Sequence, residues 1–205
     1  MPVKHPIGQQ FTNEWQMGLC KTCFVHPSTC CYSCWCTPCK AYSQRNELLE
    51  LTREKYVCAG GMLPCGCCSE PCAEDWLLCE VLCCPHFAVM VNRFLIQSRF
   101  AIRNTCCDDF IILCALCGAC CSLSHPKEHE KGDHCSSILV CAVSGCMLTQ
   151  HDAEIQHLRT VGYAGVPDYI LQMLAPAMHQ VVLRAPEQQA MQSPGYQAGK
   201  PVYIR

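Results

Sequence analysis

The chain has 205 residues, a net charge of −2 and 24 cysteines, about one residue in eight. Half of the residues are hydrophobic and only 16% are charged, so the chain can bury a sizeable core and is not disordered as a whole. Basic and acidic residues are mixed without a basic stripe, which argues against an electrostatic nucleic-acid binder.

The cysteines are confined to one block of the chain. All 24 lie between Cys20 and Cys146, and the C-terminal stretch has none. The first residues lack the apolar core of a secretory signal, and Pro2 excludes N-myristoylation, so we expect an intracellular, non-secreted protein. Disulfides are rare in a reducing compartment, so most cysteines should be thiols that pack, bind metal or carry acyl chains.

The longest apolar runs are poor membrane spans. The run from Trp76 to Ile96 contains charged residues and Pro85, and the uncharged run from Phe110 to Leu123 has only 14 residues. Runs of this kind are more typical of buried core helices. The alternative that stays open is a shallow contact with a membrane surface, supported by acylated cysteines.

Helical spacing begins after a polar lead-in and a first cysteine cluster. It predicts a helix from about Cys36 to Lys55, which Gly60-Gly61 and Pro64 end. A loop follows, and the periodicity resumes at Glu74-Asp75 and continues to Ile102. Pro85 should kink this second helix or split it in two.

Asp108-Asp109 are expected to open a third helix over 110–122, with Arg99 or Arg103 as their charge partner. Within it, three cysteines recur on one face, which favours a packed seam over metal ligation. They are Cys114, Cys117 and Cys121. A fourth helix is expected from about Ser136 to Thr160, and a last short one over 168–180.

These elements predict an all-α protein built from helical hairpins or a small bundle, with irregular cysteine-rich loops. Residues 1–19 form the lead-in, 20–160 a cysteine-rich helical domain, and 161–205 a short helix with a Pro/Gln/Gly-rich C-terminal arm. The arm ends in aromatic and basic residues that suit a protein partner. Its candidate contact residues are Tyr196, Tyr203 and Arg205.

Paired C-x2-C units are typical of structural zinc sites, and the first cysteine cluster holds three of them. The candidate metal ligands are Cys20, Cys23, Cys31, Cys34, Cys36 and Cys39. Their spacing is not that of a regular finger, and zinc is the candidate cofactor. His125 and His129 have helical ligand spacing, but the charged residues around them favour a solvated loop.

Adjacent cysteine pairs beside apolar runs indicate S-palmitoylation, with buried thiols as an equal alternative. The candidates are Cys83, Cys84, Cys120 and Cys121. No nucleophile elbow, phosphate loop or dinucleotide fingerprint occurs, so the sequence predicts a protein without enzymatic activity.

The segment Thr-Cys-Cys-Tyr-Ser-Cys-Trp-Cys-Thr-Pro-Cys-Lys-Ala-Tyr-Ser-Gln, over 29–44, resembles the opening of the placenta-specific gene 8 (cysteine-rich) domain. The segments 92–103 and 106–109 resemble its closing part, so the resemblance spans about residues 20–123. Two positions depart from the pattern: Cys36-Thr-Pro-Cys39 interrupts a Cys-Pro-Cys element, and Phe110 stands where a further cysteine is common.

Segments 3–8, 11–15, 42–46 and 145–150 look similar to the small cysteine-rich Ama-type proteins of kinetoplastid flagellates. That resemblance implies a helical, non-catalytic structural protein of the flagellum or cytoskeleton, with tubulin or axonemal proteins as partners. It places the protein at the axoneme, the cortical microtubules or the membrane–cytoskeleton boundary. The alternative implied by the wider family is a membrane-apposed or membrane-embedded metal-handling protein.

Overall fold

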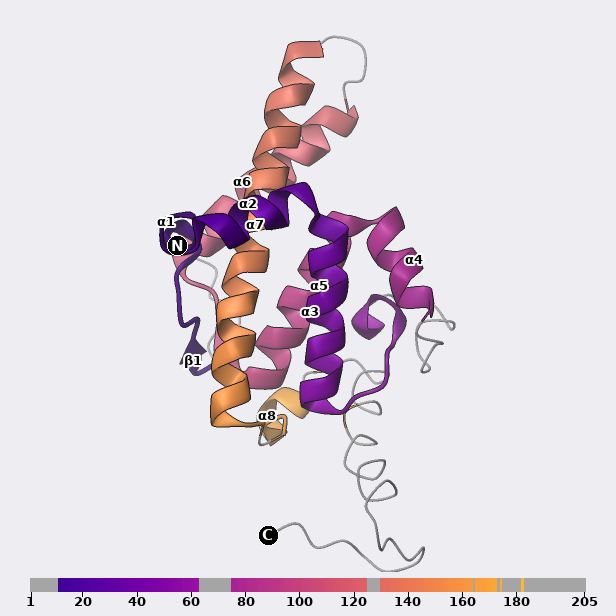
Figure 1. Cartoon of the computed structure of the whole chain (residues 1–205), viewed down its shortest axis with the longest axis vertical. Helices are drawn as coiled ribbons and strands as arrows, with labels where there is room; N and C mark the ends of the chain where they lie inside the picture. Colours follow the sequence, from indigo (N-terminus) through magenta and orange to yellow (C-terminus); the bar gives the residue numbers. More distant parts are fainter. Residues whose placement is uncertain are drawn as a thin grey trace, which may run out of the picture.

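The computed structural model describes residues 11–62, 75–124, 130–163, 165–172, 174 and 182, and the side chains of residues 119–135 lie outside this description. The described chain is mostly helical, with one short pair of strands (Figure 1). The predicted all-α class is therefore confirmed. The candidate contacts of the C-terminal arm, Tyr196, Tyr203 and Arg205, lie outside the described residues, as do His125 and His129.

The N-terminal part is a series of short helices separated by tight breaks. The 3-10 helix η2 (Leu19–Lys21) runs into α1 (Thr22–Val25), which is followed by α2 (Pro27–Trp35) and α3 (Thr37–Thr52). Pro27 fits the first turn of α2, and it disfavours helical backbone at the preceding His26. The predicted helix from Cys36 corresponds to α3, whereas α1 and α2 were not predicted from the sequence.

The second predicted helix is split at Pro85, as expected, into α4 (Asp75–Cys83) and α5 (Pro85–Phe100). Its predicted end at Ile102 is wrong. Ala101 adopts left-handed backbone with φ of 55°, which ends α5 and turns the chain into strand β2 (Ile102–Arg103). β2 pairs in parallel with β1 (Asn13–Glu14), with Asn13 opposite Ile102. A 3-10 turn, η3 (Cys58–Gly61), lies between α3 and α4.

Within the described ranges, no single helix has the length and apolarity needed to cross a membrane. The α4–α5 pair satisfies both criteria together, but its two helices are bent by 119° at their break.

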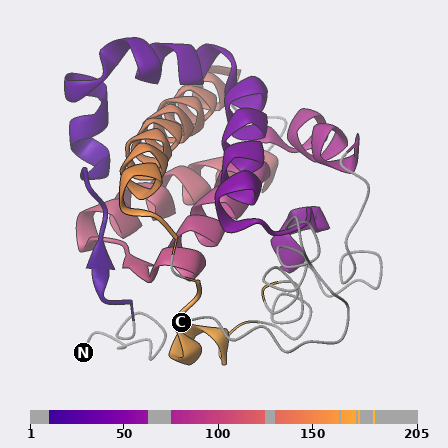
Figure 2. The same cartoon turned by 60° about the horizontal axis from the view of Figure 1, so that its bottom comes forward.

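The longest described helix, α7 (Glu130–Val161), begins six residues before its predicted start at Ser136 and contacts helices from both halves of the chain. It forms a hairpin with α6 (Cys106–Ser124), whose far end projects beyond the other helices (Figure 1). The other end of α7 packs against α2, α3 and α5, and Figure 2 shows the segment from α1 to α3 curving around it. A short helix, α8 (Asp168–Leu171), follows.

The hydrophobic core lies between α3, α5 and α7. Ala41, Ile96, Leu148 and Ile155 are fully buried there. The residues expected as a polar lead-in also reach this core, because Trp15 and Leu19 are both buried. The N-terminal segment is therefore part of the folded body from at least Trp15 onward.

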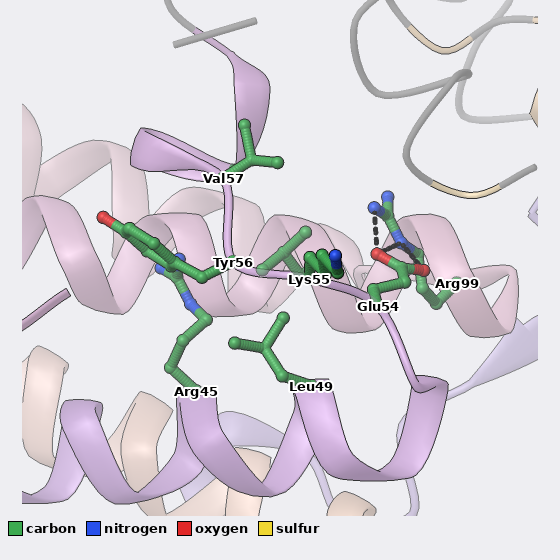
Figure 3. A pocket seen from close by; sticks show the side chains of 9 residues that line it. Arg45, Leu49, Glu54, Lys55, Tyr56, Val57 and Arg99 are labelled. Carbon is green, nitrogen blue, oxygen red and sulfur yellow. Dashed lines mark hydrogen bonds and ion pairs between the residues drawn. The ribbon is translucent and has the colours of Figure 1, made fainter. Parts of the chain in front are cut away.

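Three buried arginines cross-link the helices around this core. Arg45 on α3 donates to Glu80 on α4 at 3.1 Å and to Asn92 on α5 at 2.5 Å. Arg99 at the end of α5 donates to Glu54 at 2.7 Å, and Figure 3 shows Leu49 and Lys55 between this pair and Arg45 with Tyr56. The hollow between these side chains has a volume of about 10 Å³, which holds at most one water molecule.

The predicted charge partner of Asp108 and Asp109 is wrong, because the third buried arginine takes that place. Arg93, rather than Arg99 or Arg103, pairs with Asp108, at 3.7 Å. Arg103 is bound instead to Glu14 on the surface. Arg93 also lies over the Trp15 ring, 4.4 Å from its centroid. Sequence spacing favoured the nearer arginines, but α5 directs Arg93 into the molecule and leaves Arg103 on the short strand outside it.

A buried histidine next to this pair should make the fold sensitive to acid. His151 on α7 stacks on Trp15, and neither ring nitrogen has a hydrogen-bond partner among the described residues. Burial, reinforced by the charge of Arg93, holds the pKa of His151 well below its usual value. The unfolded chain therefore binds a proton below about pH 6.5 that the folded chain does not.

We expect the stability contributed by neutral His151 to be complete above about pH 6.5 and to decline as the pH falls toward the folded pKa, by up to about 1.4 kcal/mol per pH unit. Urea unfolding of the wild type and of His151→Phe between about pH 5 and pH 8 measures this contribution. The variant should show a shallower loss of stability on acidification. Parallel curves would contradict the assignment.

Candidate metal centre

Three thiols from separate helices meet beside α7. The sulfur atoms of Cys23 on α1, Cys30 on α2 and Cys146 on α7 all lie within 4.8 Å of one another. Cys146 Sγ is 3.7 Å from Cys23 Sγ and 3.8 Å from Cys30 Sγ. In a tetrahedral zinc site with Zn–S bonds of about 2.3 Å, neighbouring sulfurs are about 3.8 Å apart. The two sulfur–sulfur distances from Cys146 therefore already match those around a bound zinc ion.

The close approach of α2 to α7 depends on a glycine. A Cβ atom at Gly145 would lie 2.3 Å from Cys34 Sγ and 3.2 Å from the backbone oxygen of Cys30. Only a residue without a side chain permits this contact, and the next residue in the chain is Cys146. The break at His26, which turns the chain between α1 and α2, brings Cys23 and Cys30 to the same side of α7.

Burial holds two thiols of this group, those of Cys30 and Cys146, in their protonated form. Burial raises the pKa of Cys146 to about 12, and it also raises the pKa of Cys30. A metal ion that binds here must therefore displace protons, which makes its affinity strongly dependent on pH.

Two further thiols extend the contact between α2 and α7. Cys34 Sγ lies 3.7 Å from the carbonyl oxygen of Cys141, and Cys141 Sγ donates to the carbonyl oxygen of Cys34 at 3.3 Å. Burial raises the pKa of Cys34 as well. Cys34 lies one helical turn beyond Cys30 but outside the group of three.

Of the six cysteines predicted as metal ligands, the structure places only Cys23 in this group. Cys20 lies 3.5 Å from Cys107 instead, and Cys31 is exposed. Cys36 and Cys39 form a disulfide with each other, so in this state neither offers a thiolate. The prediction grouped cysteines by local C-x2-C spacing and therefore missed Cys30 and Cys146. The Cys-Cys run at 30–31 and the Gly145-Cys146 step were the only available signals.

Two of the four cysteines predicted as S-acylation sites can be placed in the structure. Cys83 and Cys84, two of the S-acylation candidates, are exposed at the break between α4 and α5, and S-acylation there stays a prediction. The side chains of Cys120 and Cys121 lie outside the description.

The predicted packed seam on α6 is wrong for Cys114 and Cys117, which are both exposed. Beyond its first turn, α6 carries apolar residues on all sides, so the periodicity of the sequence did not identify its inner face.

The chain matches no protein-family model, no curated protein and no solved structure.

Proposed function

We propose that this protein is a non-enzymatic, helical structural protein that binds one soft metal ion through Cys23, Cys30 and Cys146. The observation that supports this function is the convergence of three sulfurs from α1, α2 and α7 within 4.8 Å. Cys23 and Cys146 are 123 positions apart in the chain, so an ion bound there would join the N-terminal helices to α7.

The donor atoms favour zinc or copper(I) over hard cations, because thiolate ligands select soft metal ions. Zinc is the ion that we propose. A structural zinc site normally has four ligands, and Cys34, the next thiol along α2, is our choice for the fourth. Copper(I) would be satisfied by the three sulfurs alone.

Metal analysis of the purified chain tests the proposal. Protein purified under reducing conditions should carry about one zinc per chain, and cobalt(II) substitution should give thiolate-to-metal absorption. Cys146→Ser should bind zinc at least about 100-fold more weakly, because one of three primary ligands is lost. The matched control is Cys31→Ser, which changes an exposed cysteine outside the group.

Two results would contradict this site. One is a metal-free protein that takes up neither zinc nor copper(I). The other is an equal loss of zinc in Cys146→Ser and Cys31→Ser. That result would indicate that the metal is bound by the C-x2-C pairs predicted from the sequence. Copper(I) uptake without zinc uptake would keep the site and change the ion.

For the wider role, we propose an interaction protein of the flagellar axoneme or cortical cytoskeleton, with tubulin or axonemal proteins as partners. The resemblance of several short segments to Ama-type proteins supports this role. Exposed aromatic side chains also support it, since Phe24 and Trp35 on α1 and α2 are 86% and 91% exposed. Detergent extraction of flagellate cells should leave the protein with the cytoskeleton, and complete release into the detergent phase would contradict the role.

A membrane-apposed protein is the second candidate function. It is favoured by exposed Trp76 and Leu82 on α4, beside the exposed thiols of Cys83 and Cys84. Removal of thioesters with neutral hydroxylamine should then release the protein from membranes, and the variant Cys83→Ser with Cys84→Ser should not attach.

A further inference from the structure

One pair of cysteines differs from the other described ones in its oxidation state. Cys36 and Cys39 form a disulfide, whereas the other cysteines whose side chains the structure describes are thiols. The pair belongs to the run Trp35-Cys36-Thr37-Pro38-Cys39, a C-x-x-C element with proline before the second cysteine. Paired cysteines with this spacing are typical of redox-active dithiols as well as of metal sites.

The position of the pair in the fold favours redox chemistry. Cys36 is the N-cap residue of α3, a helix of 16 residues, and Cys39 lies in its first turn. The first turn contains no acidic residue, and no side chain caps the helix. The first turn of α3 therefore presents no carboxylate that would repel an incoming thiolate, and the positive end of the helix dipole favours its approach.

The pair is also accessible to a reaction partner. Cys39 is exposed and Cys36 is partly exposed. Trp35, the residue before them, presents almost its whole side chain to solvent. A thiolate can approach the Cys39 sulfur from solvent while Cys36 stays at the start of the helix.

We propose that Cys36 and Cys39 form a redox-active disulfide that exchanges with low-molecular-weight thiols, an activity beyond the proposed metal binding. A thiolate attacks Cys39 Sγ, the bond between the two cysteine sulfurs breaks, and Cys36 leaves as a thiolate. A second thiolate then attacks the outer sulfur of the mixed disulfide and releases Cys39. Two thiols are oxidised to one disulfide, the protein gains two electrons and two protons, and Cys36 and Cys39 become free thiols.

Glutathione buffers of graded redox ratio test the proposal on the full chain. After acid quenching and alkylation, peptide mass spectrometry reads the state of each cysteine. Cys36 and Cys39 should convert together, reversibly, with the slope of a two-electron couple within the buffered range. A pair that stays oxidised or stays reduced at every ratio would overturn the proposal.

A reduced pair that a stoichiometric metal ion protects from alkylation would show that Cys36 and Cys39 are metal ligands, and this result would also overturn the proposal.

A double variant separates this proposal from the metal site. Cys36→Ser with Cys39→Ser should lose the two-electron couple and keep about one zinc per chain. Circular dichroism verifies that the variant is folded. If zinc is retained but wild-type protein shows no couple, the redox proposal fails alone, and if the couple is present without any metal, the metal proposal fails alone.

Discussion

Replacing Arg45 by methionine should destabilise the protein by about 3–5 kcal/mol, because it leaves a buried carboxylate without its cation. Glu80 is the partner, and its side chain is only 6% exposed. Its other oxygen accepts hydrogen bonds from the Tyr56 hydroxyl and from the backbone N–H of Ala59, each at 2.8 Å. One carboxylate thus fixes α3, α4 and η3 to one another, and all three contacts depend on its charge being balanced.

Urea unfolding followed by circular dichroism measures this loss. The double variant Arg45→Met with Glu80→Gln should lose less than Arg45→Met alone, since no buried charge then stays unpaired. The control is Arg103→Ala, which removes a surface pair with Glu14 and should cost less than about 1 kcal/mol. A double variant less stable than the single variant would show that packing, and not the unpaired charge, dominates.

Two boundaries of the long helices could be predicted because local chemistry decides them. Pro85 lacks a backbone N–H and disfavours helical backbone at Cys84, so the break between α4 and α5 was readable from the sequence alone. Asp108 and Asp109 likewise indicated the start of α6. The four residues of α1 could not be recognised, because so short a helix is held only by its tertiary contacts.

The candidate site could not be predicted, because it depends on contacts across the whole chain. C-x2-C spacing detects ligands that share one turn, whereas Cys30 and Cys146 are 116 positions apart. Buried charged residues cannot be recognised from the sequence for the same reason. Arginine is normally a surface residue, yet Arg45 and Arg93 are among the largest fully buried side chains. Only the packed helices show which acids they meet.

Replacing Gly145 should damage the fold and the thiol group together. A Cβ atom there would lie 2.3 Å from Cys34 Sγ, which can rotate, but also 3.2 Å and 3.3 Å from backbone atoms of Cys30 and Cys34, which cannot move without shifting α2. Overpacking of this kind costs about 1–3 kcal/mol, and alanine regains about 1 kcal/mol of helix propensity over glycine. We therefore expect a net loss of up to about 2 kcal/mol for Gly145→Ala and about 3 kcal/mol for the larger Gly145→Val.

The metal affinity should fall in the same order. A shift of α2 away from α7 moves Cys30 away from Cys146, so zinc should bind at least about tenfold more weakly to Gly145→Val than to the wild type. Gly118→Ala is the matched control on α6, because the atom nearest to its new Cβ would be the Cβ of Ser136, at an ordinary contact distance of 3.7 Å. That variant should keep its zinc and gain up to about 1 kcal/mol of stability. If Gly145→Val bound zinc as tightly as Gly118→Ala, the crossing of α2 and α7 would not be what holds Cys30 against Cys146.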